Sequence, residues 1–184
     1  MNETSASALL SDEELVQRAR DGHAGAMDEL VTRHHASAFR VALGILRDED
    51  GAADVAQDAF LKAFRGLENF RGDASFKTWL LTIAANEAKG VLRKKGRRRE
   101  LTLETAGPRA SEEERADEAL QKAKETERSR RLMEELPDTQ RQAVSVTIFE
   151  GLSFRAVGVL IGSSEGAARV NYQHGIRRLR EMVE

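Results

Sequence analysis

The stretch from Asp54 to Phe64 reads DVAQDAFLKAF, and it sets the fold class of the chain. Its apolar residues recur every three or four positions, as they do on the inward face of an α-helix. Taken alone, the acidic residues of this stretch are best explained as a solvated helix face near a helix N-terminus, where the helix dipole favours negative charge. The residues of this inward face are Val55, Ala59, Phe60 and Ala63, and the polar residues beside them include Asp54, Gln57 and Asp58.

Further helices are predicted on both sides of this stretch. Ser11 and Glu14 form a capping box, which indicates that a helix starts there and ends near Asp21-Gly22. A long helix is expected over Ala24–Leu46, followed by a break at Asp48–Gly51. After a loop at Glu68–Ser75, another helix is expected to begin near Ser75 and to fade into Lys94–Arg99.

The hydrophobic period is lost between about Arg97 and Ala110, where Gly107-Pro108 marks a break. Helical spacing returns near Thr126, and Pro137 suits the start of a helix. We therefore predict an all-α fold in which two small helical domains, residues 1–96 and 126–184, are joined by a flexible linker over residues 97–125.

The composition narrows the class of protein. The 184 residues include no cysteine, which excludes disulfides and thiolate metal sites and fits a reducing cytoplasm. No apolar run of 18 residues occurs and the first ten residues do not resemble a secretory signal, so neither membrane insertion nor export is expected. The net charge is only −2, but residues 71–100 hold nine bases and three acids, whereas residues 48–58 hold five acids and no base. Such segregation predicts different partners for different surfaces.

The last forty residues have the spacing of a helix-turn-helix. A short amphipathic helix is expected over Phe154–Ile161 with Ser153 as its N-cap, and a second helix capped by Ser163 or Ser164 is expected to run to about Arg180. On periodicity alone, an ordinary helical hairpin fits equally well. In a helix-turn-helix, the second helix enters the major groove of DNA. Its outward residues would be Gly166, Ala167, Arg169, Val170, Gln173, His174 and Arg177, with Arg178 and Arg180 placed to contact phosphates.

Several motifs in order resemble the extracytoplasmic-function (ECF) sigma factors, group 4 of the bacterial sigma-70 family. The stretch at residues 54–64 is similar to the family's helix that binds core RNA polymerase. FRGDASFKTWL at residues 70–80 and IAAN at residues 83–86 resemble its promoter-melting and −10 segment. Leu136-Pro137 and EGLSF at residues 150–154 resemble the start of its second domain. The resemblance covers roughly residues 11–95 and 127–182.

The resemblance implies an alternative sigma factor that starts transcription of a stress or signal regulon in the cytoplasm. Its partners would be core RNA polymerase (the beta-prime clamp and the beta flap), promoter DNA and an anti-sigma factor. Core polymerase binding would fall to Asp54, Gln57, Asp58 and Phe60. Binding of the −10 element would fall to Phe70, Arg71, Asp73, Ser75, Phe76, Trp79, Asn86, Arg93 and Lys94. Binding of the −35 element would fall to Ser164, Gly166, Arg169, Val170, Gln173, His174 and Arg177.

The chain departs from the family pattern in its second domain. Ala156 stands where the family usually has an acid that completes a capping box. His174 stands where arginine is common, and Val170 where a polar residue is common. The resemblance therefore leaves the −35 sequence open.

Two other classes of protein fit the sequence less well. A stand-alone helix-turn-helix regulator would bind an operator as a dimer. Such a regulator does not require the acidic helix at residues 54–64 or the aromatic residues around the loop at residues 70–76. An enzyme is disfavoured because the four histidines have no metal-ligand spacing and no phosphate-binding Gly loop or nucleophile elbow occurs. No catalytic residue, metal, cofactor or small-molecule substrate is expected.

Overall fold

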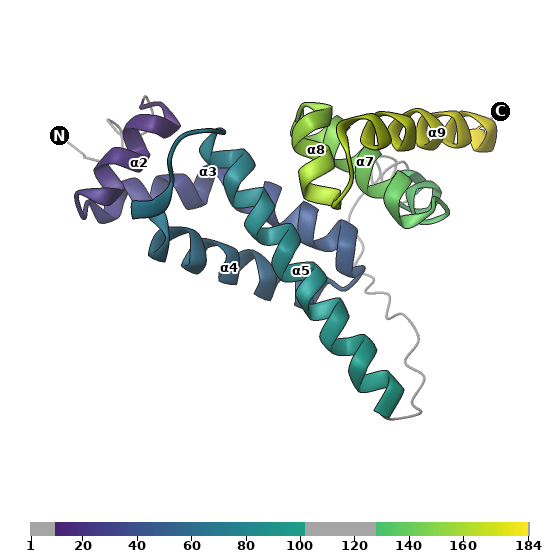
Figure 1. Cartoon of the computed structure of the whole chain (residues 1–184), viewed down its shortest axis with the longest axis horizontal. Coiled ribbons are helices and arrows are strands. Elements are labelled where there is room, and N and C mark those ends of the chain that lie inside the picture. Colours follow the sequence, from purple (N-terminus) through teal and green to yellow (C-terminus); the bar gives the residue numbers. More distant parts are fainter. Residues whose placement is uncertain (1–9, 102–127, 184) are drawn as a thin grey trace, which may run out of the picture.

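A computed structural model describes residues 10–101 and 128–183, which form two helical parts (Figure 1). The first part contains α2 (Asp12–Arg20), α3 (Ala24–Leu46), α4 (Glu49–Arg65), a 3-10 turn η1 (Leu67–Asn69) and α5 (Phe76–Leu101). The second contains a helical stretch at residues 128–134, then α7 (Asp138–Glu150), α8 (Phe154–Ile161) and α9 (Glu165–Val183). The described residues include no strand, so the predicted all-α class is confirmed.

Serine caps fix where the helices begin. Ser11 Oγ accepts a hydrogen bond from the main-chain N of Glu14, and Glu14 Oε2 accepts one from the main-chain N of Ser11, which confirms the predicted capping box. Ser153 caps α8 through the main-chain N of Ala156, and Ser164 caps α9 through that of Ala167. These caps satisfy main-chain donors that have no partner inside the helix.

The core of the first part forms around α3, which packs against α2, α4 and α5. Small residues line these contacts and let the helix backbones approach closely. Fully buried alanines include Ala38, Ala42, Ala52, Ala56, Ala59, Ala63, Ala84, Ala85 and Ala88. Larger side chains fill the space between, with Leu15, Leu30, Phe76, Leu80 and Leu81 almost completely buried.

Two glycines set the packing of the helix-turn-helix. A Cβ on Gly158 would lie 2.9 Å from the main-chain oxygen of Ser163, so the turn can fold back only onto a glycine. A Cβ on Gly175 would lie 2.6 Å from Val144 Cγ2, so this glycine lets α9 approach α7 closely. Gly162, with φ 75°, ends α8 in the left-handed region that favours glycine.

The structure confirms the predicted helix start at Pro137, which is the N-cap of α7, and corrects two element boundaries. The break predicted at Asp48–Gly51 is shorter and lies at Arg47–Asp48, because the chain turns at Arg47, which has φ 54°, and α4 already begins at Glu49. α5 does not fade at Lys94–Arg99 but continues to Leu101. Most of the predicted linker lies outside the described residues, so its limits stay a prediction.

The two parts are in contact with each other. α7 packs against α3, and α8 packs against α5 (Figure 1). Val146, Val157 and Leu160 belong to the same buried apolar cluster as Val41 and Ile45 of the first part. Within the described ranges, no helix is both long and apolar enough to cross a membrane.

Candidate nucleic-acid and polymerase interfaces

The outer face of α4 presents an acidic surface. Asp54, Gln57 and Asp58 are all exposed there. Phe60 is only 5% exposed and packs beside Phe64, with ring centroids 5.9 Å apart. Of the four residues predicted to bind polymerase, three are therefore accessible, whereas Phe60 supports the helix from below.

The loop between η1 and α5 is held in place by aromatic packing and by one arginine. Phe70 packs against Trp79 and edge-on against Phe76, with centroid distances of 4.9 and 6.1 Å. Arg20 of α2 donates hydrogen bonds to the main-chain oxygens of Leu67, at 3.1 Å, and of Phe70. The loop is therefore anchored at its base.

The same packing separates the residues predicted to bind the −10 element. Arg71, Asp73 and Ser75 are exposed, and Phe70 and Trp79 are half-buried. Phe76 is 1% exposed, so it cannot stack on a base and serves as the core support of the loop. Ser75 Oγ accepts a hydrogen bond from the main-chain N of Thr78, and this bond caps the start of α5.

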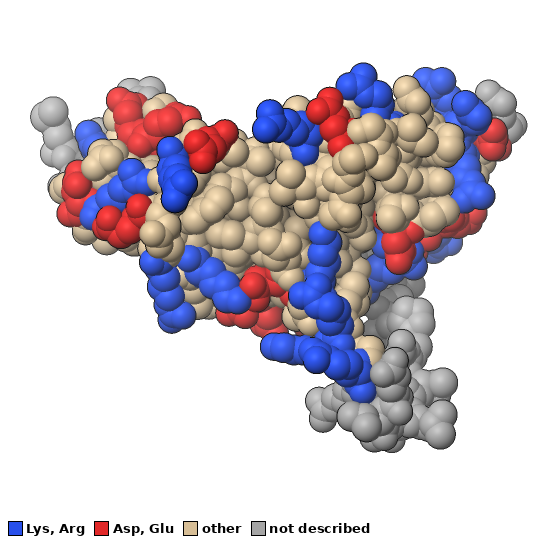
Figure 2. All heavy atoms as spheres, in the orientation of Figure 1, with Lys and Arg blue, Asp and Glu red and all other residues tan. Residues whose placement is uncertain are grey.

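One side of α5 carries an aromatic ring, an amide and a cation in sequence. Trp79, Asn86 and Arg93 are seven residues apart, which is close to two helical turns, so they lie on one side of the helix. Asn86 and Arg93 are exposed, and so are Lys94 and Arg97. Figure 2 shows Lys and Arg gathered along the C-terminal half of α5. This side forms a line about 20 Å long from the loop to the basic end.

Neighbouring groups shift the pKa values of Lys89 on α5 and of Asp48 beside it. Burial lowers the pKa of Lys89, and the positive charge of the nearby Arg93 lowers it further. The hydrogen bond from Lys95, followed by one from the main chain of Gly51, lowers the pKa of Asp48. Lys95 therefore joins α5 to the start of α4, at 2.8 Å from Asp48 Oδ2.

α9 exposes the residues predicted to bind the −35 element. Ser164, Gly166, Arg169, Val170, Gln173, His174 and Arg177 are exposed, whereas Ala168 and Gly175 are buried. The guanidinium of Arg169 lies 5.1 Å from the ring centroid of Phe154 and 3.3 Å from Glu165 Oε1. These two contacts restrain the Arg169 side chain.

Sequence reasoning missed the residues that position these surfaces. Arg20 fixes the aromatic loop, and His34 lies 2.6 Å from Asp12 inside the first part. Glu150 is buried between the two parts, with Arg40 and Lys77 against it. An isolated charged residue at a helix end is usually exposed, so only the packing of the two parts could reveal the role of Glu150.

The described residues contain no group of three or more His, Asp or Glu side chains placed to hold a metal ion.

Comparisons with known proteins decide the family. Residues 30–98 match the family model for sigma-70 region 2. The ECF RNA polymerase sigma-E factor of Escherichia coli strain K12 is 32% identical over 186 residues, covering 97% of this chain and 95% of the relative. This chain belongs to the ECF sigma factors. The RNA polymerase sigma-H factor of Pseudomonas aeruginosa is 34% identical over 181 residues, covering 94% of this chain and 92% of that factor.

Solved structures share the fold of this ECF sigma factor. CnrH, in complex with the cytosolic domain of CnrY, has a TM-score of 0.66 and 22% identity, covering 94% of this chain and 96% of that one. The sigma factor RpoE from Bartonella quintana, in complex with the anti-sigma factor NepR, has a TM-score of 0.64 and 22% identity, covering 85% and 95%. These two structures therefore share the helical fold of this chain.

Proposed function

We propose that this ECF sigma factor reads the −10 element with the loop and α5, and the −35 element with α9. The line from Trp79 through Asn86 to Arg93 carries the proposal. Opening a promoter leaves unpaired bases, which a protein holds by stacking and by hydrogen bonds to base edges. The half-buried Trp79 and Phe70 can offer ring surface, and the Asn86 amide can both donate and accept.

The cations beyond Asn86 give this surface its affinity. Arg93, Lys94 and Arg97 are exposed and sit where a strand leaving the loop would carry its phosphates. Arg71, Asp73 and Ser75 border the loop and contribute polar groups around a flipped base. Phe76 does not contact DNA in this scheme, because it is buried.

The −35 element would be read in the major groove by the outward side of α9. Arg169 suits guanine, Gln173 suits adenine and Val170 suits a thymine methyl, while Arg177 can hold a phosphate. His174 stands where the family commonly has arginine, so α9 lacks a permanent cation at this position. The affinity of α9 for the −35 element should therefore depend less on salt concentration than the affinity of an arginine-rich helix does.

Core RNA polymerase would bind the exposed acids of α4. Asp54 and Asp58 lie one turn apart beside Gln57 and suit a basic groove, which we assign to the beta-prime clamp. The exposed apolar residues Ile148 and Phe149 of α7 suit the beta flap. The similarly folded RpoE from Bartonella quintana, solved with the anti-sigma factor NepR, supports an anti-sigma partner here as well. The protein would act in the cytoplasm beside the polymerase, without catalysis of its own.

A pull-down followed by run-off transcription tests the proposal. The purified protein should bind core polymerase and start transcription on a promoter selected from a randomised library. The Asp54→Lys, Asp58→Lys double variant should lose most binding, whereas Asp28→Lys, an exposed acid of α3, should bind normally. If the wild type fails to bind core polymerase, the proposal is overturned. If the two acid variants bind equally well, the α4 assignment is overturned.

A further inference from the structure

The contact between the two parts is built around one buried carboxylate. The side chain of Glu150, at the end of α7, is 1% exposed, and the positive groups that neutralise it come from the first part. Arg40 Nε of α3 donates a hydrogen bond to Oε1 at 2.8 Å. The Lys77 ammonium of α5 lies 3.0 Å from Oε2 and donates its hydrogen bond to the main-chain oxygen of the same residue. The Glu150 carboxylate of the second part is thus neutralised only by cations of the first part.

Three of the cations that cross the contact reach carbonyls near helix C-termini. Lys77 binds the last carbonyl of α7, and Lys89 of α5 binds the Leu160 carbonyl in the last turn of α8. In the opposite direction, Arg141 of α7 donates to the Gly44 carbonyl near the end of α3 at 3.1 Å. Helix C-termini carry unpaired carbonyls and partial negative charge, so each part caps helices of the other.

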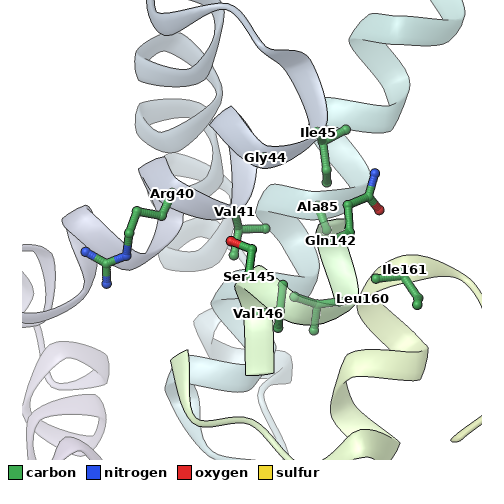
Figure 3. A pocket seen from close by; sticks show the side chains of 10 residues that line it. All are labelled: Arg40, Val41, Gly44, Ile45, Ala85, Gln142, Ser145, Val146, Leu160 and Ile161. Carbon is green, nitrogen blue, oxygen red and sulfur yellow. The ribbon is translucent and has the colours of Figure 1, made fainter. Parts of the chain in front are cut away.

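An apolar seam lies between these polar contacts (Figure 3). Val41 and Ile45 of α3 and Ala85 of α5 face Val146 of α7 and Leu160 of α8. A more exposed ion pair, Arg47 to Asp138 at 2.8 Å, lies at the edge. The contact is specific, and it can also separate, because opening lets water solvate Glu150, Arg141 and Lys89 again. Buried ion pairs often add little net stability for this reason.

The closed arrangement does not fit the spacing of the promoter elements. Their centres are about 25 base pairs apart by definition, which is about 85 Å of B-form DNA. Asn86 is one helical turn from Lys89, Lys89 contacts α8, and α8 packs directly on α9. With helices about 10 Å across, the two reading surfaces lie on the order of 20–40 Å apart. The two parts must separate before one chain can hold both elements.

We propose that this sigma factor closes on itself through a Glu150 lock, in which Arg40 and Lys77 neutralise a carboxylate buried by the docked helix-turn-helix, and that the lock must open for promoter binding. The proposal rests on the assignment of the −10 and −35 surfaces above. It concerns the chain alone, without an anti-sigma factor. In the closed state, Lys77 and Lys89 are committed to helix ends, and they become available to phosphates on opening.

Energy transfer between two labels on the whole chain tests closure. The chain has no cysteine, so Thr32→Cys and Ser129→Cys, both exposed, accept donor and acceptor dyes at defined places. The otherwise wild-type labelled protein should show a predominantly high-transfer population. The Arg40→Met, Lys77→Met double variant keeps the aliphatic stems but leaves Glu150 buried without a counter-charge. It should shift the closed-to-open ratio by about 100-fold or more toward open.

Two further variants keep the test decisive. Adding Glu150→Gln to the double variant removes the uncompensated charge and should recover much of the high-transfer population. Lys62→Met with Arg65→Met, on α4, is the matched control and should leave transfer unchanged, because Lys62 pairs with Glu87 inside the first part. Circular dichroism should show equal helix content in all variants.

Low transfer in the labelled wild type would overturn the lock. Unchanged transfer in the Arg40→Met, Lys77→Met variant, or no recovery with Glu150→Gln, would also overturn it. Run-off transcription by the unlabelled wild type is scored separately, so failure of the promoter assignment and failure of the lock give different results.

Discussion

At the scale of single residues, accessibility separates the groups that can touch DNA from those that only support them. Asn86 is exposed on α5, and Arg169 is exposed on α9 but already held by Phe154 and Glu165. Phe76 and Phe60, by contrast, belong to the core. Aromatic rings next to a functional loop are therefore divided between two tasks that residue type alone does not distinguish.

Asn86 and Arg169 permit a reciprocal test of the two surfaces. Asn86→Ala removes the hydrogen bonds proposed for one unpaired base. It should lower discrimination at a single −10 position by about 10-fold while leaving the −35 preference intact. Arg169→Ala should do the reverse. The measurement is run-off transcription across promoters with every single-base change in both elements. A −10 profile for Asn86→Ala identical to that of the wild type would remove Asn86 from the site.

Residue exposure on α9 followed from spacing alone. Periodicity placed Arg169, Val170, Gln173 and Arg177 outward, and the structure confirms that all four are exposed. The support residues could not be found in this way. Arg20 lies 47 residues from the Leu67 carbonyl that it holds, and nothing in the local pattern joins them. Polar groups that bridge distant segments become visible only in three dimensions.

At the scale of elements, caps and glycines explain why the helix-turn-helix has its shape. Ser153 and Ser164 start its two helices, and Gly158 leaves room for the turn between them. Strong capping signals gave accurate helix starts at Asp12, Phe154 and Glu165. The break at Asp48–Gly51 was overestimated because acids and a glycine resemble a loop, although they are tolerated in the first turn of a helix.

The missing acid at residue 156 can be supplied to test the cap of α8. Ser153 already accepts a hydrogen bond from the main-chain N of Ala156, at 3.3 Å, so a glutamate there would complete a capping box. Ala156→Glu should stabilise the second part by about 0.5–1 kcal/mol. Ala156→Gln is the uncharged comparison, and it separates the capping bond from the dipole term. Urea unfolding followed by helix content measures the change, and a less stable Ala156→Glu variant would contradict this account of the helix start.

At the scale of the whole molecule, the mutual arrangement of the two parts could not be predicted from the sequence. The hydrophobic period distinguishes inward from outward faces, but it does not say whether an inward face meets its own part or the other. Val146 and Leu160 fit the core of a small helical domain equally well, and only the structure shows that they also meet Val41 and Ile45. Glu150 lies far from Arg40 and Lys77 in the chain, and its carboxylate is brought next to these two cations only at this contact.

The protonation of Glu150 links closure to pH. Burial alone would raise the pKa of the Glu150 carboxyl, but hydrogen bonds from Arg40 and Ser37 and the Lys77 ammonium outweigh it and hold that pKa below its usual value of 4.5. A group whose pKa is lowered by closure stabilises the closed state fully above its usual pKa. That contribution is lost as the pH falls through the lowered value. Closure should therefore be constant from about pH 8 to pH 5 and weaken below about pH 4.5.

Transfer between the Thr32→Cys and Ser129→Cys labels, titrated from pH 8 to pH 3, measures this dependence. Helix content followed in parallel distinguishes opening of the contact from unfolding of either part. Glu150→Gln has no carboxylate to protonate at this position, so its closed population should respond less to acid than that of the wild type. Equal acid responses of the two proteins would mean that other carboxylates control the contact. Glu150 should instead be the dominant titrating group, because it is buried and loses both of its cations when the parts separate. Asp138 also pairs across the contact, with Arg47, but it is exposed and keeps Arg141 of its own helix.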